Sequence, residues 1–305
     1  MKKSVFPILA VAVLFLLLTH PALSFEGASR GLVLWYQTVL PTLLPFMICS
    51  KMIVSLGGIR LLTAPAAPLL KPVLRLSDGG CYVLVSGLLC GYPMGARNCG
   101  EFVKEGRISA SEGRYLLSIS NHPSPMFLLG YMAAAADPSI PLGLLLIAVY
   151  LPVIPIAFLS RHVYHVSEGT ARNPLFQENR LSFDQSLMDC LEVMVKIGGY
   201  IMVFSILAEF IGQIRAVPPW ARSLLLGITE ITTGIQAVSR TLAGIPQGMA
   251  LCWTASFGGL CGLFQTNSVL SGSGLGTGQY FLWKILHGLM SAAVFMLLAP
   301  SFLPG

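Results

Sequence analysis

The chain alternates long apolar segments with short polar ones, and the apolar segments have the length of membrane-spanning helices. A helix needs about 20 apolar residues to cross a bilayer. Windows of this kind lie near residues 5–23, 31–57, 113–135, 140–160, 187–211, 246–267 and 280–302. The pattern predicts an all-α polytopic membrane protein with about 7 transmembrane helices.

Two further apolar stretches, 61–96 and 218–242, are interrupted by glycine and proline. The first contains the run GYPMG at 91–95, and the second has Glu230 at its centre. Backbone that leaves helical geometry at membrane depth exposes N–H and C=O groups that lipid cannot satisfy, so it persists only inside protein or beside a wet cavity. We expect two broken or re-entrant helices next to a pathway or binding site.

Composition supports the membrane assignment and narrows the classes of function. The 305 residues are 54% hydrophobic and only 10% charged, whereas a soluble domain carries about 25% charged residues. The net charge of +6 is scattered over loops, so the expected partner is the lipid bilayer and not nucleic acid. Seven cysteines form no CxxC pair, so we expect neither a metal site nor a cofactor. We predict a multi-pass protein of the cell (inner) membrane.

Basic residues predict the orientation, because cytoplasmic loops carry an excess of lysine and arginine. Two groups stand out, namely Arg97, Lys104, Arg107 and Arg114, and then Arg161, Arg172 and Arg180. With both groups in the cytoplasm, the two interrupted stretches enter from opposite faces, as in an inverted repeat. Weak internal similarity of 87–96 to 225–234, and of 118–130 to 253–265, agrees with such a repeat.

These observations divide the chain into four parts. Residues 1–30 form an anchor helix or a signal-like segment, since Lys2 and Lys3 precede an apolar run and a possible cleavage site follows it; we favour the anchor. Residues 31–160 form the first repeat, which includes a cytoplasmic helical hairpin at 97–114. A cytoplasmic loop follows at 161–186, and the second repeat occupies 187–305.

Local signals add detail to this division. Ser109 and Glu112 have the spacing of a capping box. Glu192 and Lys196 stand four apart with the acid first, which favours an ion pair on one helix. We assign His162 and His165 to a solvated loop, since no carboxylate or cysteine nearby completes a metal-binding set.

Four motifs in a fixed order carry a resemblance to a known family. They are LPTLLPF at 40–46, GYPMGA at 91–96, KEGRIS at 104–109 and SNHPSPMF at 120–127. Together they resemble the YlbJ-type sporulation membrane proteins, of the wider group with a nucleoside-recognition "Gate" domain. The resemblance implies a Gate-like inner-membrane protein of spore-forming bacteria, related in its gate segments to concentrative nucleoside carriers and ferrous-iron permeases. It implies no substrate. His122 departs from the pattern, where a small or amide residue is expected.

The first break supplies one set of candidate substrate-binding residues, namely Gly91, Tyr92, Pro93, Gly95 and Asn98. If a half-helix begins here, its free N–H groups and positive dipole end would face the cavity and favour a polar or anionic group. The alternative is that the neighbouring Arg97 only anchors the chain at the cytoplasmic interface.

Asn121 and Ser124 are further candidates, in a segment where Pro123 and Pro125 remove amide donors and free upstream carbonyls. Their side-chain oxygens suit a sugar hydroxyl or a cation; the alternative is a proline kink that neighbouring helices repair. His122 is either a proton relay or a packing residue.

Glu230 and Thr233 are the candidates in the second break. A carboxylate within a membrane segment costs about 2.5–3.5 kcal/mol on insertion scales, and is by default a functional group. We predict cation or proton coupling at Glu230, with neighbouring threonine hydroxyls as co-ligands. The alternative is an interfacial glutamate paired with Arg222 or Arg240.

The sequence therefore favours a transporter or pore for a small polar solute or ion, nucleoside-like or a cation, that is linked to sporulation; a homo-oligomer is compatible with this prediction. The alternative is a non-transporting assembly or signalling component of spore formation. Its partner surfaces would be small-residue faces such as Gly198–Gly199 and Gly258–Gly259. An enzyme is not expected, because the chain has no HExxH motif and no recognisable nucleophile–histidine–acid spacing.

Overall fold

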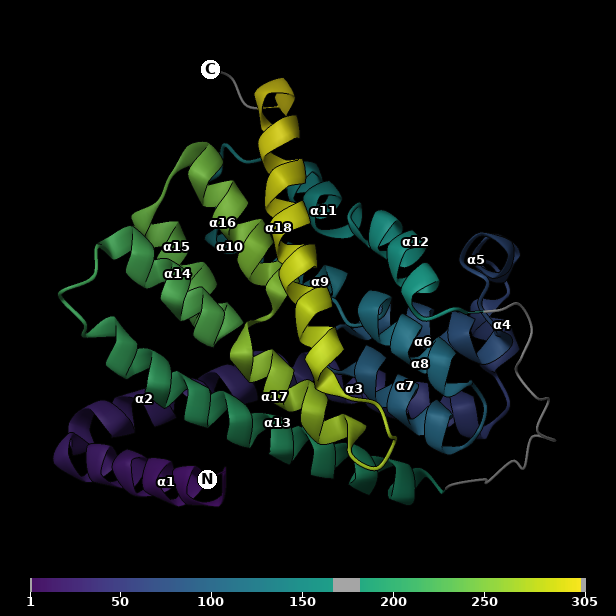
Figure 1. Ribbon diagram of the computed structural model, residues 1–305, viewed down its shortest axis with the longest axis horizontal. Coiled ribbons are helices and arrows are strands. Elements are labelled where there is room, and N and C mark those ends of the chain that lie inside the picture. Colours follow the sequence, from purple (N-terminus) through teal and green to yellow (C-terminus); the bar gives the residue numbers. More distant parts are fainter. Residues whose placement is uncertain (1, 167–181, 303–305) are drawn as a thin grey trace.

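The computed structural model describes residues 2–166 and 182–302, and every element within those ranges is a helix (Figure 1). Arg172 and Arg180 of the second basic group lie outside the described residues. The first half contains α1 (Lys2–Thr19), α2 (Pro21–Leu34), the π-helix η1 (Trp35–Val39), α3 (Leu40–Ser55), α4 (Ile59–Thr63), α5 (Ala67–Leu74), α6 (Asp78–Cys90), α7 (Met94–Lys104), α8 (Ala110–Ile119), α9 (Pro125–Phe127), the π-helix η2 (Leu128–Met132), α10 (Ala133–Ala135), α11 (Leu142–Tyr150) and α12 (Val153–Val163). The second half contains α13 (Phe183–Gly212), α14 (Pro219–Thr229), α15 (Ile231–Thr241), α16 (Gly244–Phe257), α17 (Gly259–Leu270) and α18 (Thr277–Phe302).

Within the described ranges, four helical stretches are long and apolar enough to cross a membrane: Pro21–Ser55, Leu142–Val163, Phe183–Gly212 and Thr277–Phe302. The pair α5 and α6 meets the same test but bends by 110°. The all-helical membrane architecture is thus confirmed, while the expected number of seven spans stays a prediction.

Long helices frame the molecule (Figure 1). Helix α13 runs along one side with α2 packed beside it, and α18 crosses the fold against α16. Helices α2 and α13 approach closely because Gly27 has no side chain: a Cβ there would lie 2.6 Å from the Cα of Ile206. The short helices that come from the interrupted stretches lie on the two sides of α18 in this view, α14 and α15 to the left and α6 and α7 to the right.

Both predicted interruptions are real breaks. Helix α6 ends at Cys90 and α7 begins at Met94, while α14 and α15 are separated by Glu230 alone. Two windows that read as membrane spans are also broken: five residues separate the end of α8 at Ile119 from the start of α9 at Pro125, and α16 and α17 meet at Gly258. Each half of the chain therefore holds one broken hairpin and one broken helix.

The two broken hairpins are built alike, because in each the helices touch through a pair of glycines. A Cβ on Gly87 of α6 would lie 2.9 Å from the Cα of Gly95 in α7. A Cβ on Gly234 of α15 would lie 2.6 Å from the backbone nitrogen of Gly227 in α14. Glycine permits this approach since it presents no side chain to the facing helix. The inverted repeat itself stays a prediction.

Of the two local predictions, the capping box forms only in part and the ion pair is confirmed. The Oγ of Ser109 accepts from the Glu112 amide at 3.1 Å, but the Glu112 carboxylate accepts from the Ser77 amide at 2.8 Å and does not reach back to Ser109. Only half of the expected capping box forms, because a tertiary partner takes the glutamate. The predicted ion pair between Lys196 and Glu192 is confirmed at 2.6 Å.

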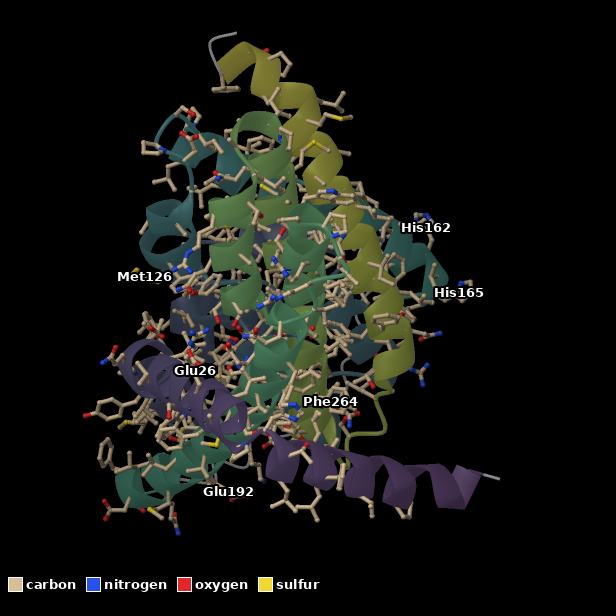
Figure 2. All side chains as sticks on the ribbon, turned by 90° about the vertical axis from the view of Figure 1, so that its left-hand side faces the viewer. Glu26, Met126, His162, His165, Glu192 and Phe264 are labelled. Carbon is tan, nitrogen blue, oxygen red and sulfur yellow. The ribbon has the colours of Figure 1, made fainter. Side chains whose placement is uncertain are left out.

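His162 and His165 are exposed, as predicted, but His162 lies in the last turn of α12 and not in a loop, because the helix continues to Val163. Figure 2 shows both at the outer edge of the molecule, at the end of α12 and far from Met126.

Candidate functional site

The four breaks converge on one cavity of about 110 Å³. Each break contributes a wall: Tyr92 from the first, Ser124 from the second, Glu230 from the third and Gly258 from the fourth. Since one water occupies about 30 Å³ of liquid, the cavity has room for several waters or for a solute of similar size.

The opposite side of the cavity is mainly apolar and comes from α3 and its neighbours. Phe46 and Met126 line the cavity and are 44% and 57% exposed, so the cavity reaches the molecular surface between α3 and α9. Figure 2 shows Met126 at this edge. The site is therefore amphipathic, with polar groups at the breaks and apolar groups towards its mouth.

Tyr92 joins the first break to the fourth. Its hydroxyl donates to the carbonyl of Ser256 at 3.0 Å, and its ring lies against Gly258. A Cβ at Gly258 would meet the ring at 2.9 Å, and the φ of +81° there also favours glycine. The break at Gly258 thus provides the space that Tyr92 fills.

Ser124 joins the second break to the first. Its Oγ accepts from the Phe127 amide at 3.2 Å and so caps α9. The backbone of Gly91, with φ of +78°, passes so close that a Cβ would lie 2.6 Å from the Ser124 nitrogen. Gly91 therefore permits contact between two chain breaks.

Asn121 lies behind the cavity wall and connects three other helices. Its Nδ2 donates to the hydroxyls of Tyr280 at 2.7 Å and Thr266 at 3.0 Å, and its Oδ1 accepts from the amide of Ala96 at 3.4 Å. Asn121 is buried, so in this conformation it positions the breaks and has no contact with the cavity.

Glu230 is 2% exposed and caps α15. Its carboxylate accepts from the amides of Thr232 at 3.0 Å and Thr233 at 2.8 Å, from the Thr233 hydroxyl at 2.9 Å, and from the Thr232 hydroxyl. The Thr232 and Thr233 hydroxyls therefore bond to the carboxylate itself, while Thr229 donates to the carbonyl of Leu225; their role as co-ligands of a cation stays a prediction.

The alternative of an arginine partner for Glu230 is wrong in the described part of the chain. Arg222 donates to the carbonyl of Ile214 at 3.1 Å. Arg240 lies in the last turn of α15, whereas Glu230 caps its first.

Replacing Glu230 by glutamine is expected to loosen the start of α15. The amide keeps one acceptor oxygen but loses the negative charge at a helix N-terminus, which costs about 1–2 kcal/mol when a cap is weakened. Hydrogen exchange of the amides at 231–234 and the thermal midpoint of the purified protein measure the effect. Protection equal to wild type would show that the carboxylate is not the cap.

The other predicted residues surround the site. Gly91, Pro93 and Gly95 form and pack the first break, and Thr233 bonds to Glu230 from outside the cavity lining. Asn98 turns away, since its Nδ2 donates to the Oγ of Ser86 at 2.7 Å.

Arg97 is neither an exposed anchor nor a cavity group. It is buried, and its Nε donates to the Glu101 carboxylate at 3.0 Å.

Sequence reasoning missed two buried residues next to the site, Lys284 and His287 of α18. The Nζ of Lys284 donates to the Tyr92 hydroxyl at 2.5 Å and to the Asn121 carbonyl at 3.2 Å. The signal was available: both lie in an otherwise apolar span, three residues apart and hence on one helix face. His122 packs edge-on against His287 with ring centroids 5.2 Å apart.

Across residues 2–166 and 182–302, no group of three or more His, Cys, Asp or Glu side chains is placed to hold a metal ion.

Comparison with known proteins agrees with the motifs. The chain is 25% identical to the sporulation integral membrane protein YlbJ of Bacillus subtilis (strain 168), over 95% of this chain and 82% of YlbJ. No family model and no solved structure matches the chain. The similarity covers nearly the whole chain, and the described helices include several that are able to span a membrane. The chain is therefore a YlbJ-like integral membrane protein.

Proposed function

We propose that the chain is a transporter or pore that moves a small polar solute or ion through the cavity where the four breaks meet. One observation carries this proposal: four separate interruptions of apolar helices, two from each half, line the same cavity. Broken backbone at membrane depth is costly unless it faces protein or water. Secondary transporters place their sites at such breaks.

The matching order of elements supports a Gate-like inverted repeat. In each half a long helix, α3 or α13, precedes a glycine-paired hairpin, then a broken helix, then a membrane-spanning stretch. Transporter sites commonly lie at the interface of two such repeats. On this proposal, nucleoside recognition or cation binding belongs to the cavity.

The polar wall favours a solute that forms hydrogen bonds over a bare cation. The Glu230 carboxylate already accepts four hydrogen bonds from Thr232 and Thr233, so little of its coordinating capacity is left. Gln265 also lines the cavity and has a side-chain oxygen that can accept a hydrogen bond. A small molecule with a polar edge and an apolar face suits this amphipathic lining.

The name of the relative places YlbJ in sporulation, and we propose that this chain also serves spore formation, in the cell membrane and not as an enzyme. A purely structural role is less well supported, because three of its four proposed surface glycines are used inside the chain, and only Gly199 has free space around it. Gly198 packs on Trp35, Gly258 on Tyr92 and Gly259 on Glu230. A homo-oligomer stays a prediction.

Filling the cavity at Gly262 is the direct test. Gly262 lines the cavity, and a Cβ there meets no atom within 4 Å, so Gly262→Leu is expected to fold and to occupy the solute space. A thermal-stabilisation screen of the full chain against nucleosides, metal ions and small polar metabolites would identify ligands, and liposome uptake would follow. Stabilisation and uptake are expected in wild type and absent in Gly262→Leu.

Gly199→Leu is the matched control, since Gly199 also has free space but lies on α13 away from the cavity. A ligand that stabilises wild type and Gly262→Leu equally would place the binding site elsewhere and contradict the proposal.

A further inference from the structure

Lys284 has the surroundings of a fully hydrogen-bonded ammonium. It is 1% exposed, and its Nζ contacts three groups: the Tyr92 hydroxyl at 2.5 Å, the Asn121 carbonyl at 3.2 Å and the His287 Nδ1 at 3.5 Å. An ammonium has three N–H donors and no acceptor. Three donors therefore meet three positions that can accept.

The neighbouring bonds fix the direction of each contact. The Nε2 of His287 lies 2.8 Å from the Val149 carbonyl, which can only accept, so this nitrogen carries the hydrogen and Nδ1 has the lone pair. The Tyr92 hydroxyl donates to Ser256 and so accepts from Lys284. Every donor around Lys284 points away from its Nζ.

No carboxylate balances this charge among the described residues. The side chains able to titrate that bond to Lys284 are Tyr92 and His287, with His122 and Tyr280 just behind them. The other titratable groups on the described helices packed against α18 form no bond to Lys284: Glu112, Arg114 and Tyr115 of α8, Tyr150 of α11, Arg161 and His162 of α12, Cys252 of α16 and Cys261 of α17. An ammonium at Lys284 would thus be held by neutral oxygen and nitrogen atoms alone.

The position of Lys284 links that charge to the cavity. Tyr92 lies between them, since it lines the cavity and its hydroxyl contacts Nζ. The second oxygen ligand is the carbonyl of Asn121, freed by the second break. Hydroxyls and carbonyls at broken helices are the ligands that hold coupling cations in transporters. Here the Nζ of Lys284 occupies the position between a hydroxyl and a freed carbonyl that a coupling cation would take.

We propose that Lys284 takes the role of the coupling cation, so that transport is driven by protons bound and released at its Nζ. The inference rests on the proposed transport function and names its energy source. With the proton bound, three charge-assisted hydrogen bonds hold the first and second breaks together. Release requires Tyr92 to swing away from Nζ and admit water from the cavity; one N–H bond then breaks and that water takes the proton. The neutral amine keeps two donors, and the Tyr92 wall stays free to move.

Proton binding at the Nζ of Lys284 and the position of the Tyr92 side chain are then linked. Two opposing contributions act at Lys284: the desolvation of a charge in the membrane interior, and the hydrogen bonds that satisfy it. Movement of Tyr92 removes a bond and admits water, which changes both contributions. A group whose proton affinity differs between two conformations couples the proton to the equilibrium between them.

The cavity thiol Cys261 makes the coupling measurable without a known substrate. In full-length protein carrying Cys49→Ser and Cys90→Ser, which remove the exposed thiol and the second cavity thiol, modification of Cys261 by a cationic methanethiosulfonate is followed in liposomes over a pH series. At each pH, the modification rate of Cys261 in the protein with Lys284 is divided by the rate in the Lys284→Met variant. Because the Cys261 thiol titrates in both proteins, this division cancels its titration. This ratio is expected to rise about tenfold from acidic to alkaline pH, as the loss of a charged hydrogen bond implies.

Two controls sharpen the result. Lys284→Arg keeps its charge, so Cys261 is expected to stay protected at every pH. Replacement of Na⁺ by choline is expected to change nothing. A ratio that stays constant with pH, or protection by Na⁺, would overturn the inference while leaving a wet pathway in place.

The transport proposal fails in a different way. If Cys261 is unmodified in every variant at every pH, the cavity is dry, and the transport function falls together with the coupling. If Lys284→Met does not fold, Tyr92→Phe gives the same comparison, since it removes the acceptor hydroxyl and leaves the lysine in place.

Discussion

Replacing Gly95 by alanine is expected to prevent the chain from folding. A Cβ at this position would overlap the Ser120 carbonyl oxygen and lie 2.6 Å from its carbon. These are backbone atoms, so no side-chain rotation relieves the clash. Gly87 packs against the same carbonyl oxygen, so this oxygen is in contact with the backbones of both α6 and α7. Overpacking of this kind costs about 3 kcal/mol or more.

The measurement is the yield of monodisperse protein in detergent, with the thermal midpoint of whatever fraction is recovered. Gly143→Ala is the control, because a Cβ at Gly143 has no atom within 4 Å; it is expected to match wild type. Normal yield and midpoint for Gly95→Ala would mean that α6, α7 and the Ser120 segment are not packed as described.

Replacing Asn121 by alanine is the second large effect, and we expect a loss of about 3 kcal/mol because three buried partners are left unpaired. They are the hydroxyls of Thr266 and Tyr280 and the amide of Ala96. The Asn121 carbonyl still accepts from Lys284, so the variant separates the amide network from the lysine. Chemical unfolding of the purified protein measures the loss.

Asn267→Ala is the matched amide control, since Asn267 is exposed and contacts only Thr277 at 3.3 Å among its described partners. Surface substitutions of this kind change stability by about 0.5 kcal/mol or less. Equal stability of Asn121→Ala and Asn267→Ala would contradict the network around Asn121.

The breaks were predictable because their causes are local. Proline removes an amide donor and glycine tolerates unusual backbone angles, so GYPMG at 91–95 and the segment around Pro123 interrupt helices wherever they occur. Glu230 was predictable for another reason: a carboxylate in an apolar stretch needs donors, and the two threonines that follow it supply them.

The convergence of the breaks was not predictable in the same way, because it depends on contacts between distant segments. Asn121 bonds to Tyr280, which lies 159 residues away in the chain. The Glu112 carboxylate accepts from the distant Ser77 amide and not from the N-terminus of its own helix. Averaged hydropathy also conceals single residues: the span that contains Lys284 and His287 still reads as a plain membrane helix. The three-residue spacing of Lys284 and His287, which puts both on one helix face, would have revealed them where the average hydropathy does not.

The polar face of α18 has a consequence for biogenesis. Lys284 and His287 lie within a helix that must leave the translocon for lipid, where a central lysine costs about 2.5–3.5 kcal/mol on insertion scales. The groups that bond to this pair from other parts of the described chain, namely Tyr92, Asn121 and Val149, all precede α18. These partners are thus synthesised before α18 needs them, and release of this helix into the bilayer is favoured only once they are docked beside it.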